Sequence, residues 1–163
     1  MKNLFRCLVL SLALVGLPAA ASVEVTFLPA DQYADIGDSV DARRAMKEIQ
    51  DYLGKLGARY LQPDFRLSVD VLEVDLAGSM KMVGSHGEWI RVLNGKVDAP
   101  LLRLRYTLRV GEQVMSRGED ILTDPMYLDH SDGRDADAPL HHEKVLLERW
   151  FRARFGAAPS GKN

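Results

Sequence analysis

Alternation of apolar and polar residues predicts most of the strands in this chain. Residues 23–27 and 101–110 alternate cleanly, as half-buried strands do. Residues 65–76 alternate too, but their apolar positions change phase near Val71 and Leu72, which indicates a bulge or a strand buried on both faces. Residues 89–93 form a shorter strand, and the glycine-dotted residues 77–88 before it are expected to be a loop.

The segment 101–122 is predicted to be a β-hairpin. Gly111 and Glu112 supply the turn, and residues 113–122 return beside residues 101–110. The returning strand alternates poorly, so the register of the hairpin stays open.

Two segments carry apolar residues at helical spacing. The first begins near Ser39 or Asp41, and the second covers residues 140–155. The apolar stripe of the first is Val40, Met46, Ile49, Leu53, Leu56 and Tyr60, and that of the second includes Val145, Leu146, Trp150 and Phe155. The order of elements predicts an α+β fold with two layers, a mostly antiparallel sheet of four to five strands and two helices packed on one face.

The first 21 residues have the pattern of a cleavable signal peptide. Lys2 and Arg6 precede an apolar run over residues 7–17, and small residues at 19–21 follow it. A spanning helix needs roughly 20 apolar residues, so this run is too short to be an anchor. We expect cleavage after Ala21, which leaves one domain over residues 22–156 and a disordered tail over 157–163, with no membrane span.

Composition excludes several classes of function. Cys7 is the single cysteine and leaves with the leader, so the mature chain has no thiol nucleophile or disulfide. Loss of Lys2 and Arg6 leaves 19 of the 21 basic residues against 23 acidic ones, a formal charge of −4 that does not favour nucleic acid. Gly78, Gly84 and Gly87 are too far apart for a phosphate cradle, no serine lies in a nucleophile elbow, and no cofactor is predicted.

Acidic residues lie along one predicted strand and basic residues along another. Glu73 and Asp75 share a face, and paired carboxylates of this kind can perform acid–base catalysis when one pKa is raised. Arg103, Arg105 and Arg109 lie on one face of another strand. Cross-strand ion pairing accounts for these charges more simply than catalysis does.

The four histidines do not form a recognisable metal motif. His141 and His142 are adjacent rather than four residues apart, while His86 and His130 lie in predicted loops. The polar segment 124–139 has the acidity of a calcium loop without its alternation. We predict a surface loop there and no metal.

Several segments resemble a known family. They are Val25-Thr26-Phe27, Tyr33-Ala34-Asp35-Ile36, Val71 to Gly78, Arg103 to Tyr106 with Gly118-Glu119-Asp120, Asp124 to Tyr127, and Glu143 to Phe151. Together they resemble the exported bacterial proteins of the domain of unknown function 3016 family. The resemblance implies export in Gram-negative bacteria and hence a periplasmic location, and it implies no catalytic residue. Asp75 would bind amides of its own loop, with Gly78 at a positive φ.

These observations favour a periplasmic, non-enzymatic binding module whose partner is an envelope protein or glycan, in an oligomeric state that the sequence leaves open. The candidate binding residues are Asp75, Gly78, Trp89, Arg91, Arg103, Arg105 and Arg109. The alternatives are a hydrolase of an envelope polymer that uses Glu73 or Asp75 with a histidine, and a histidine-based metal-binding protein.

Overall fold

The computed structural model describes residues 20–37, 39–84, 87–130 and 138–156. Nearly all of the expected signal peptide and the whole expected tail lie outside these residues, as does His86. The tail prediction and the cleavage prediction are therefore not tested by the fold.

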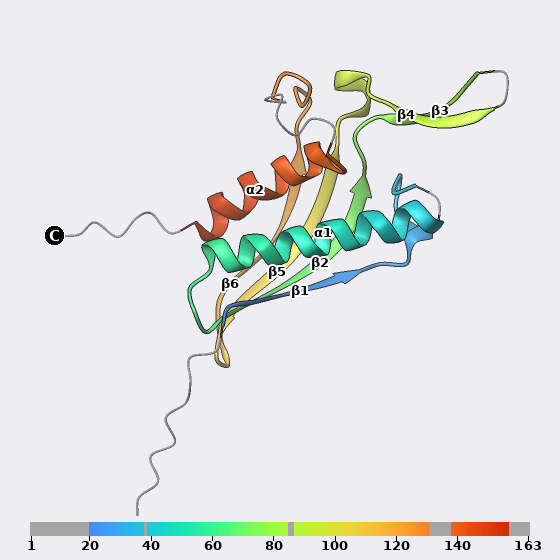
Figure 1. The fold of residues 1–163 in the computed structure, drawn as a ribbon. Coiled ribbons are helices and arrows are strands. Elements are labelled where there is room, and N and C mark those ends of the chain that lie inside the picture. The colour runs from blue at the N-terminus through green and yellow to red at the C-terminus, as the bar shows by residue number, and fades with distance from the viewer. Residues whose placement is uncertain (1–19, 38, 85–86, 131–137, 157–163) are drawn as a thin grey trace, which may run out of the picture.

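Four strands form the main sheet in the order β1-β2-β5-β6. β1 (Ser22–Phe27) runs parallel to β2 (Phe65–Asp75), and β5 (Leu101–Val110) and β6 (Gln113–Thr123) complete the sheet with antiparallel pairings. Both helices cover the same face of this sheet (Figure 1). The predicted two-layer α+β fold is confirmed. We call the uncovered side of the sheet the open face.

Two bulges set the strand registers. In β2, the pairing with β5 shifts between Val71 and Glu73, which confirms the bulge predicted from the change of phase. A second shift lies opposite Leu108 and Arg109, where Met115 is the extra residue of β6. This extra residue explains why the returning strand alternates poorly in the sequence, because a bulge moves every later side chain to the other face.

The helices are α1 (Ser39–Tyr60) and α2 (His141–Phe155). Ile49, Leu53 and Leu56 of α1 are buried as predicted, but Val40 is 52% exposed, and that part of the predicted stripe is wrong. In this first part of α1, the buried side chains are instead the small residues Ala42 and Ala45. The buried stripe of α2 consists of Leu146, Leu147, Trp150 and Phe151.

Small side chains and aromatic rings close the core between the helices and the sheet. A Cβ on Gly57 of α1 would lie 2.2 Å from Val23, so the glycine lets β1 approach the helix closely. At the other side of the core, Tyr106 packs edge-on against Trp150 and Phe155. The resulting core is continuous from α1 to α2.

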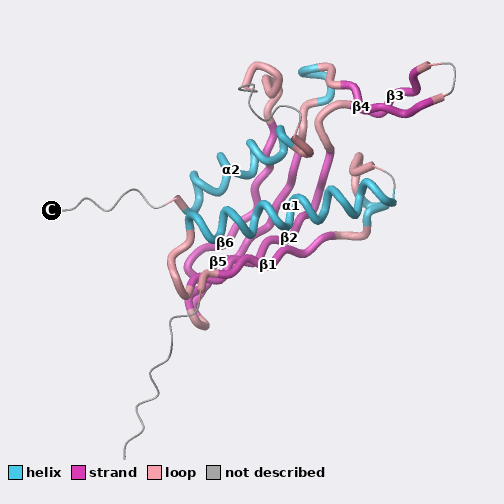
Figure 2. Tube along the Cα trace, viewed as in Figure 1, coloured by secondary structure: helices cyan, strands magenta, loops and turns pink. Residues whose placement is uncertain are grey.

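A separate two-stranded sheet projects from one end of the domain. β3 (Ser79–Val83) pairs antiparallel with β4 (Glu88–Val92), and we call this pair of strands the arm (Figures 1 and 2). The predicted loop at 77–88 is therefore wrong, since a strand lies within it. Short 3-10 helices, η1 (Ala30–Gln32) and η2 (Gly95–Asp98), complete the elements of the described chain. No helix in the described ranges is long and apolar enough to cross a membrane.

Candidate functional site

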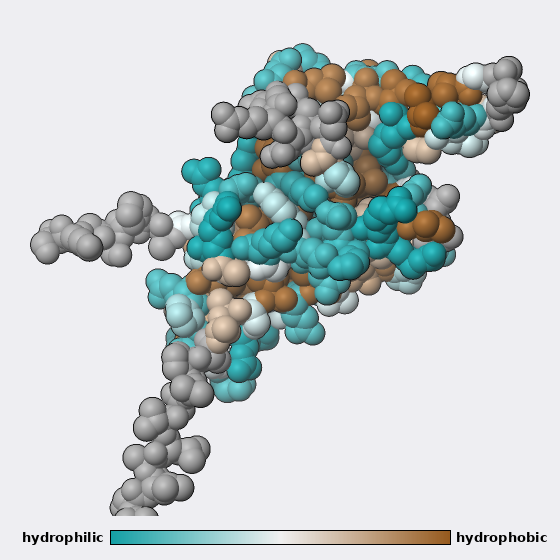
Figure 3. Space-filling model, in the orientation of Figure 1, coloured by the Kyte–Doolittle hydropathy of each residue, from teal (hydrophilic) through white to brown (hydrophobic). Residues whose placement is uncertain are grey.

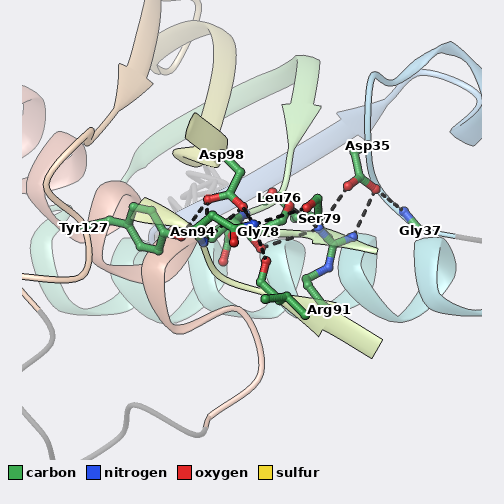
Figure 4. A network of polar contacts seen from close by, with 12 residues as sticks. Asp35, Gly37, Leu76, Gly78, Ser79, Arg91, Asn94, Asp98 and Tyr127 are labelled. Carbon is green, nitrogen blue, oxygen red and sulfur yellow. Dashed lines mark hydrogen bonds and ion pairs between the residues drawn. The ribbon is translucent and has the colours of Figure 1, made fainter. Parts of the chain in front are cut away.

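Arg91 joins the base of the arm to the domain. Its guanidinium donates to both carboxylate oxygens of Asp35, at 2.9 and 3.0 Å, and to the carbonyl of Gly78 at 2.9 Å (Figure 4). Longer contacts of 3.4 and 3.5 Å reach the carbonyls of Leu76 and Ala77. Backbone hydrogen bonds from Asp35 to Val74 and from Leu76 to Asp35 hold the same loop against the end of β2. The two-pronged pair fixes both the charge and the orientation of the guanidinium.

A second set of hydrogen bonds lies at the other side of the arm's base. Asp98 accepts from the backbone N–H of Asn94 at 2.9 Å and from its side-chain amide at 2.7 Å, and Tyr127 donates its hydroxyl to the same carboxylate at 3.0 Å. Burial alone would raise the pKa of Asp98, but the hydrogen bonds from Asn94 and Tyr127 outweigh it and hold that pKa below its ordinary value. The network ties the end of the arm to the loop after β6.

Gly78 occupies the tightest point of this base. Its φ is +82°, which confirms the predicted positive φ, and its N–H donates to the carbonyl of Asp98 at 3.0 Å. A Cβ there would lie 2.6 Å from the carbonyl oxygen of Val92. The turn therefore needs glycine for both its backbone angle and its close packing.

Two carboxyl groups near the base have raised pKa values. Burial raises the pKa of Glu143, which is 2% exposed and accepts the N–H of Ala77 at 2.7 Å. Burial also raises the pKa of Asp75, the neighbouring charge of Asp35 raises it further, and Arg91 opposes the shift. A site with shifted acids can perform proton transfer, but structural networks shift pKa values in the same way.

The arm exposes apolar side chains on a defined face. Met82 lies opposite Trp89 and Met80 lies opposite Arg91, so alternation puts these four side chains on one side of the arm. Met82 and Trp89 are 60% and 58% exposed. On the other side, Ile90 is also exposed. Figure 3 shows the apolar colour gathered over the arm, above the hydrophilic surface of α1.

A cavity of about 310 Å³ lies where this face meets the domain. Arg91 and Met80 line it from the arm, Ala45 and Glu48 line it from α1, and Leu140 lines it from the start of α2. Ile36 and Leu76 add two more apolar walls. The volume is at the lower end of the range of ligand pockets, and it suits an inserted side chain.

The arginines of β5 lie elsewhere. Arg103, Arg105 and Arg109 lie on the open face, whereas the cavity under the arm is lined by α1 and so lies on the helix side. The structure thus separates them from Arg91, Gly78 and Trp89, which lie at the arm. Asp75, at the end of β2, pairs with Leu101 and so lies on the same face as Glu73 and Arg103.

Ion pairing on the open face is confirmed for two of these arginines. Arg103 Nε lies 3.2 Å from Glu73 without hydrogen-bond geometry, and Arg105 donates to Glu119 at 3.1 and 3.3 Å. Because of the bulge in β2, Asp70, which pairs with Arg105, lies on the open face together with Glu73. Glu73 therefore has an arginine partner, as the cross-strand interpretation predicts.

The described histidines lie near the start of α2 and after β6. His130 Nδ1 lies 2.7 Å from Asp124, which also accepts from Arg149 at 2.8 Å and from the N–H of Met126 at 3.0 Å, so this carboxylate already has three partners. The rings of His141 and His142 are edge-on at 5.1 Å, and His141 Nε2 is buried with no hydrogen-bond partner among the described residues. Within the described ranges, no group of three or more metal-binding side chains is close enough to hold an ion.

Several residues of this site were missed by the sequence reasoning. Asp35 and Glu143 come from segments far from the arm in the chain, and no local pattern marks their contact with it. Met80 and Met82 carried a usable signal, because they alternate with Ser79 and Lys81, but the surrounding glycines favoured a loop. The hydrogen bond between Tyr127 and Asp98 likewise has no signal in the sequence.

The fold and the site define a two-layer α+β domain with a projecting β-hairpin arm. The chain belongs to the family described as Protein of unknown function (DUF3016), which matches residues 21–153. A crystal structure from Xanthomonas campestris, of a protein in the family DUF330, is similar with 14% identity and a TM-score of 0.35, over 85% of this chain and 83% of that chain. No curated protein matches the sequence.

Proposed function

We propose that this protein is an exported, non-enzymatic binding module that holds an apolar segment of an envelope protein against its arm. The observation that carries the proposal is the arm's exposed face of Met80, Met82 and Trp89, which leads into a cavity with apolar walls. Single exposed apolar residues are ordinary, but a contiguous row that continues into a cavity is typical of a binding site. Export rests on the leader pattern of residues 1–21, and the periplasmic location rests on the resemblance to exported proteins of Gram-negative bacteria.

The anchoring of the arm supports a binding role. Arg91, Asp35 and the carbonyl of Gly78 hold one side of its base, and Asp98 with Asn94 holds the other. An arm held in place loses less conformational entropy when a partner binds than an unanchored loop would lose. The polar network thus serves to present the apolar face in a fixed direction.

The chemistry of the face favours an apolar protein segment over an anionic glycan. Met80 and Met82 are unbranched and polarizable, so they adapt their shape to a partner's side chain, and Trp89 supplies a large rigid surface. Arg91, the charged residue on this face, is already bound by Asp35. The partner is therefore expected to insert an aliphatic or aromatic side chain beneath the arm while its backbone lies across Trp89.

A comparison of baits in envelope extract tests the proposal. The variant Met82→Ser with Trp89→Ala should lose a partner that the unaltered chain captures. Its matched control, Val97→Ser with Met126→Ser, removes exposed apolar surface outside the arm and should keep that partner. Loss of the partner in both variants, or in neither, would refute the arm as the binding site.

The arginines on the open face need their own variant. Replacement of Arg103, Arg105 and Arg109 by alanine should leave the partner bound. If this variant loses the partner while the arm variant keeps it, the partner is anionic and binds the open face instead. The position of Trp89 gives a direct second readout: its fluorescence should shift to shorter wavelength on binding, and Trp89→Phe, which leaves the buried Trp150, should show no shift.

A further inference from the structure

The outer edge of β6 is available for pairing. β6 ends the order of the main sheet, has 11 residues, and pairs with β5 on its inner side while none of the described residues pairs with its outer side. The backbone N–H and C=O groups along that side form a template for a further strand. β1, the opposite edge, has 6 residues and offers a shorter template.

Side chains along β6 are arranged symmetrically about Gly118. On the open face, Arg117 and Glu119 flank the glycine, and Met115 and Ile121 follow them on either side. Met115 lies two residues from Arg117, so alternation puts its side chain on the open face as well. Met115 and Ile121 are 53% and 64% exposed, which is unusual for an edge strand.

We propose that two copies of this chain pair through β6, antiparallel and centred on Gly118, to form one continuous eight-stranded sheet. In this register Arg117 of each copy faces Glu119 of the other, and Met115 of each copy faces Ile121 of the other. Met115 and Ile121 are thus both covered, and each side of the twofold axis gains an ion pair and an apolar contact. The interface does not involve the arm, so it is independent of the proposed function.

The charges make this register specific. Arg117 has no ion-pair partner among the described residues, and Glu119 is held in place by Arg105. A slip of two residues along the strand would place Arg117 opposite Arg117, or Glu119 opposite Glu119, and such like-charge pairs are unfavourable. Charges on an edge strand usually prevent association, whereas here the alternating signs select one partner, a second copy in one register.

A groove on the helix side of the same edge supports the pairing. It has a volume of about 470 Å³ and lies between β6 and α2. Leu122, Leu146, Trp150 and Ala153 line it. Asp120 also lines it and accepts hydrogen bonds there from Trp150 and Arg154. In the proposed register, Ser116 of the added strand faces this Asp120 at the groove.

Sedimentation of the chain from Ser22 to Asn163 tests the proposal first. The mass should move from monomer to dimer as concentration rises. Arg117→Glu should raise the dissociation constant by about tenfold, because it places two like-charge pairs in the interface. Arg109→Glu changes an exposed charge on β5 of the same face and should leave the dissociation constant unchanged. A chain that stays monomeric at all concentrations, or equal effects of both variants, would overturn the proposal.

Two further experiments test the register itself: mixing of charge-reversed variants, and disulfide cross-linking between copies. Equimolar Arg117→Glu and Glu119→Arg should dimerise together better than either variant alone, since each pair of opposite charges is restored. The variant with Met115→Cys and Ile121→Cys should form a disulfide-linked dimer on oxidation, because these positions face each other only between copies. If the unaltered chain sediments as a dimer but this variant does not cross-link, the register centred on Gly118 is excluded.

Discussion

Replacement of Arg91 by alanine removes the strongest link between the arm and the domain. The lost contacts are the pair to Asp35 at 2.9 and 3.0 Å and the bond to the carbonyl of Gly78 at 2.9 Å. Pairs at the surface are worth about 0–1 kcal/mol, and breaking a buried pair costs about 3–5 kcal/mol. The side chains of Arg91 and Asp35 are 24% and 31% exposed, which lies between these limits. We therefore expect a loss of about 2–3 kcal/mol in the free energy of unfolding.

Urea unfolding measures this loss. With a slope of about 1–3 kcal/mol per molar urea for a domain of this size, the midpoint should fall by roughly 1 M. Arg105→Ala is the matched control, since Arg105 also makes a pair with a carboxylate, but its side chain is 57% exposed. The control should change the free energy of unfolding by no more than about 1 kcal/mol.

Hydrogen exchange shows where the loss acts. Amides of the arm should exchange faster in Arg91→Ala, while amides of β5 should keep their protection relative to global unfolding. If Arg91→Ala destabilises no more than Arg105→Ala, or if the arm exchanges at an unchanged rate, the guanidinium does not anchor the arm. A double-mutant cycle with Asp35→Ala then separates the pair from the carbonyl contact.

Three further changes and one control variant, Gly54→Ala, test the packing and the buried charge. Gly78→Ala should destabilise by about 2–4 kcal/mol in urea unfolding, because of its positive φ and the contact with Val92, whereas Gly54→Ala, on α1 with open space around it, should stabilise by about 0.5–1 kcal/mol. Phe151→Ala should cost about 3–5 kcal/mol because its side chain is fully buried. Burial raises the pKa of Glu143 above 4.5, so the stability that its protonated form contributes is present below that pH and is lost as pH rises through the raised pKa. Glu143→Gln should therefore stabilise at neutral pH and have little effect at acid pH, and an equal effect at both would contradict the buried-acid interpretation.

Strand and helix positions were largely predictable because they follow from local patterns. The change of phase at Val71 and Leu72 marked the bulge of β2, and the clean alternation of residues 101–110 marked β5. The strand β3 was missed because glycines at 78, 84 and 87 surround it, and glycines in turns look like glycines in loops. Val40 was misassigned because a periodic pattern does not show where a helix leaves the sheet.

The candidate site was only partly predictable. Gly78, Trp89 and Arg91 stood out from residue type and position, and the structure places them together at the arm. The sequence analysis also grouped Arg91 with the arginines of β5 as one candidate binding set, and the structure separates them. These residues lie on opposite sides of the sheet, and that separation follows from how the arm leaves the domain, which no alternation in the sequence records.

The sequence by itself determined most of the secondary structure, the α+β class and the family resemblance, because each of these depends largely on residues close together in the chain. The tertiary structure decided which distant groups meet. Asp35 reaches Arg91 and Glu143 reaches Ala77 across 56 and 66 residues, and the free outer edge of β6 exists only once β5 has paired on its inner side. Such contacts depend on the register and twist of a whole sheet, and these are properties of the assembled layers rather than of any segment.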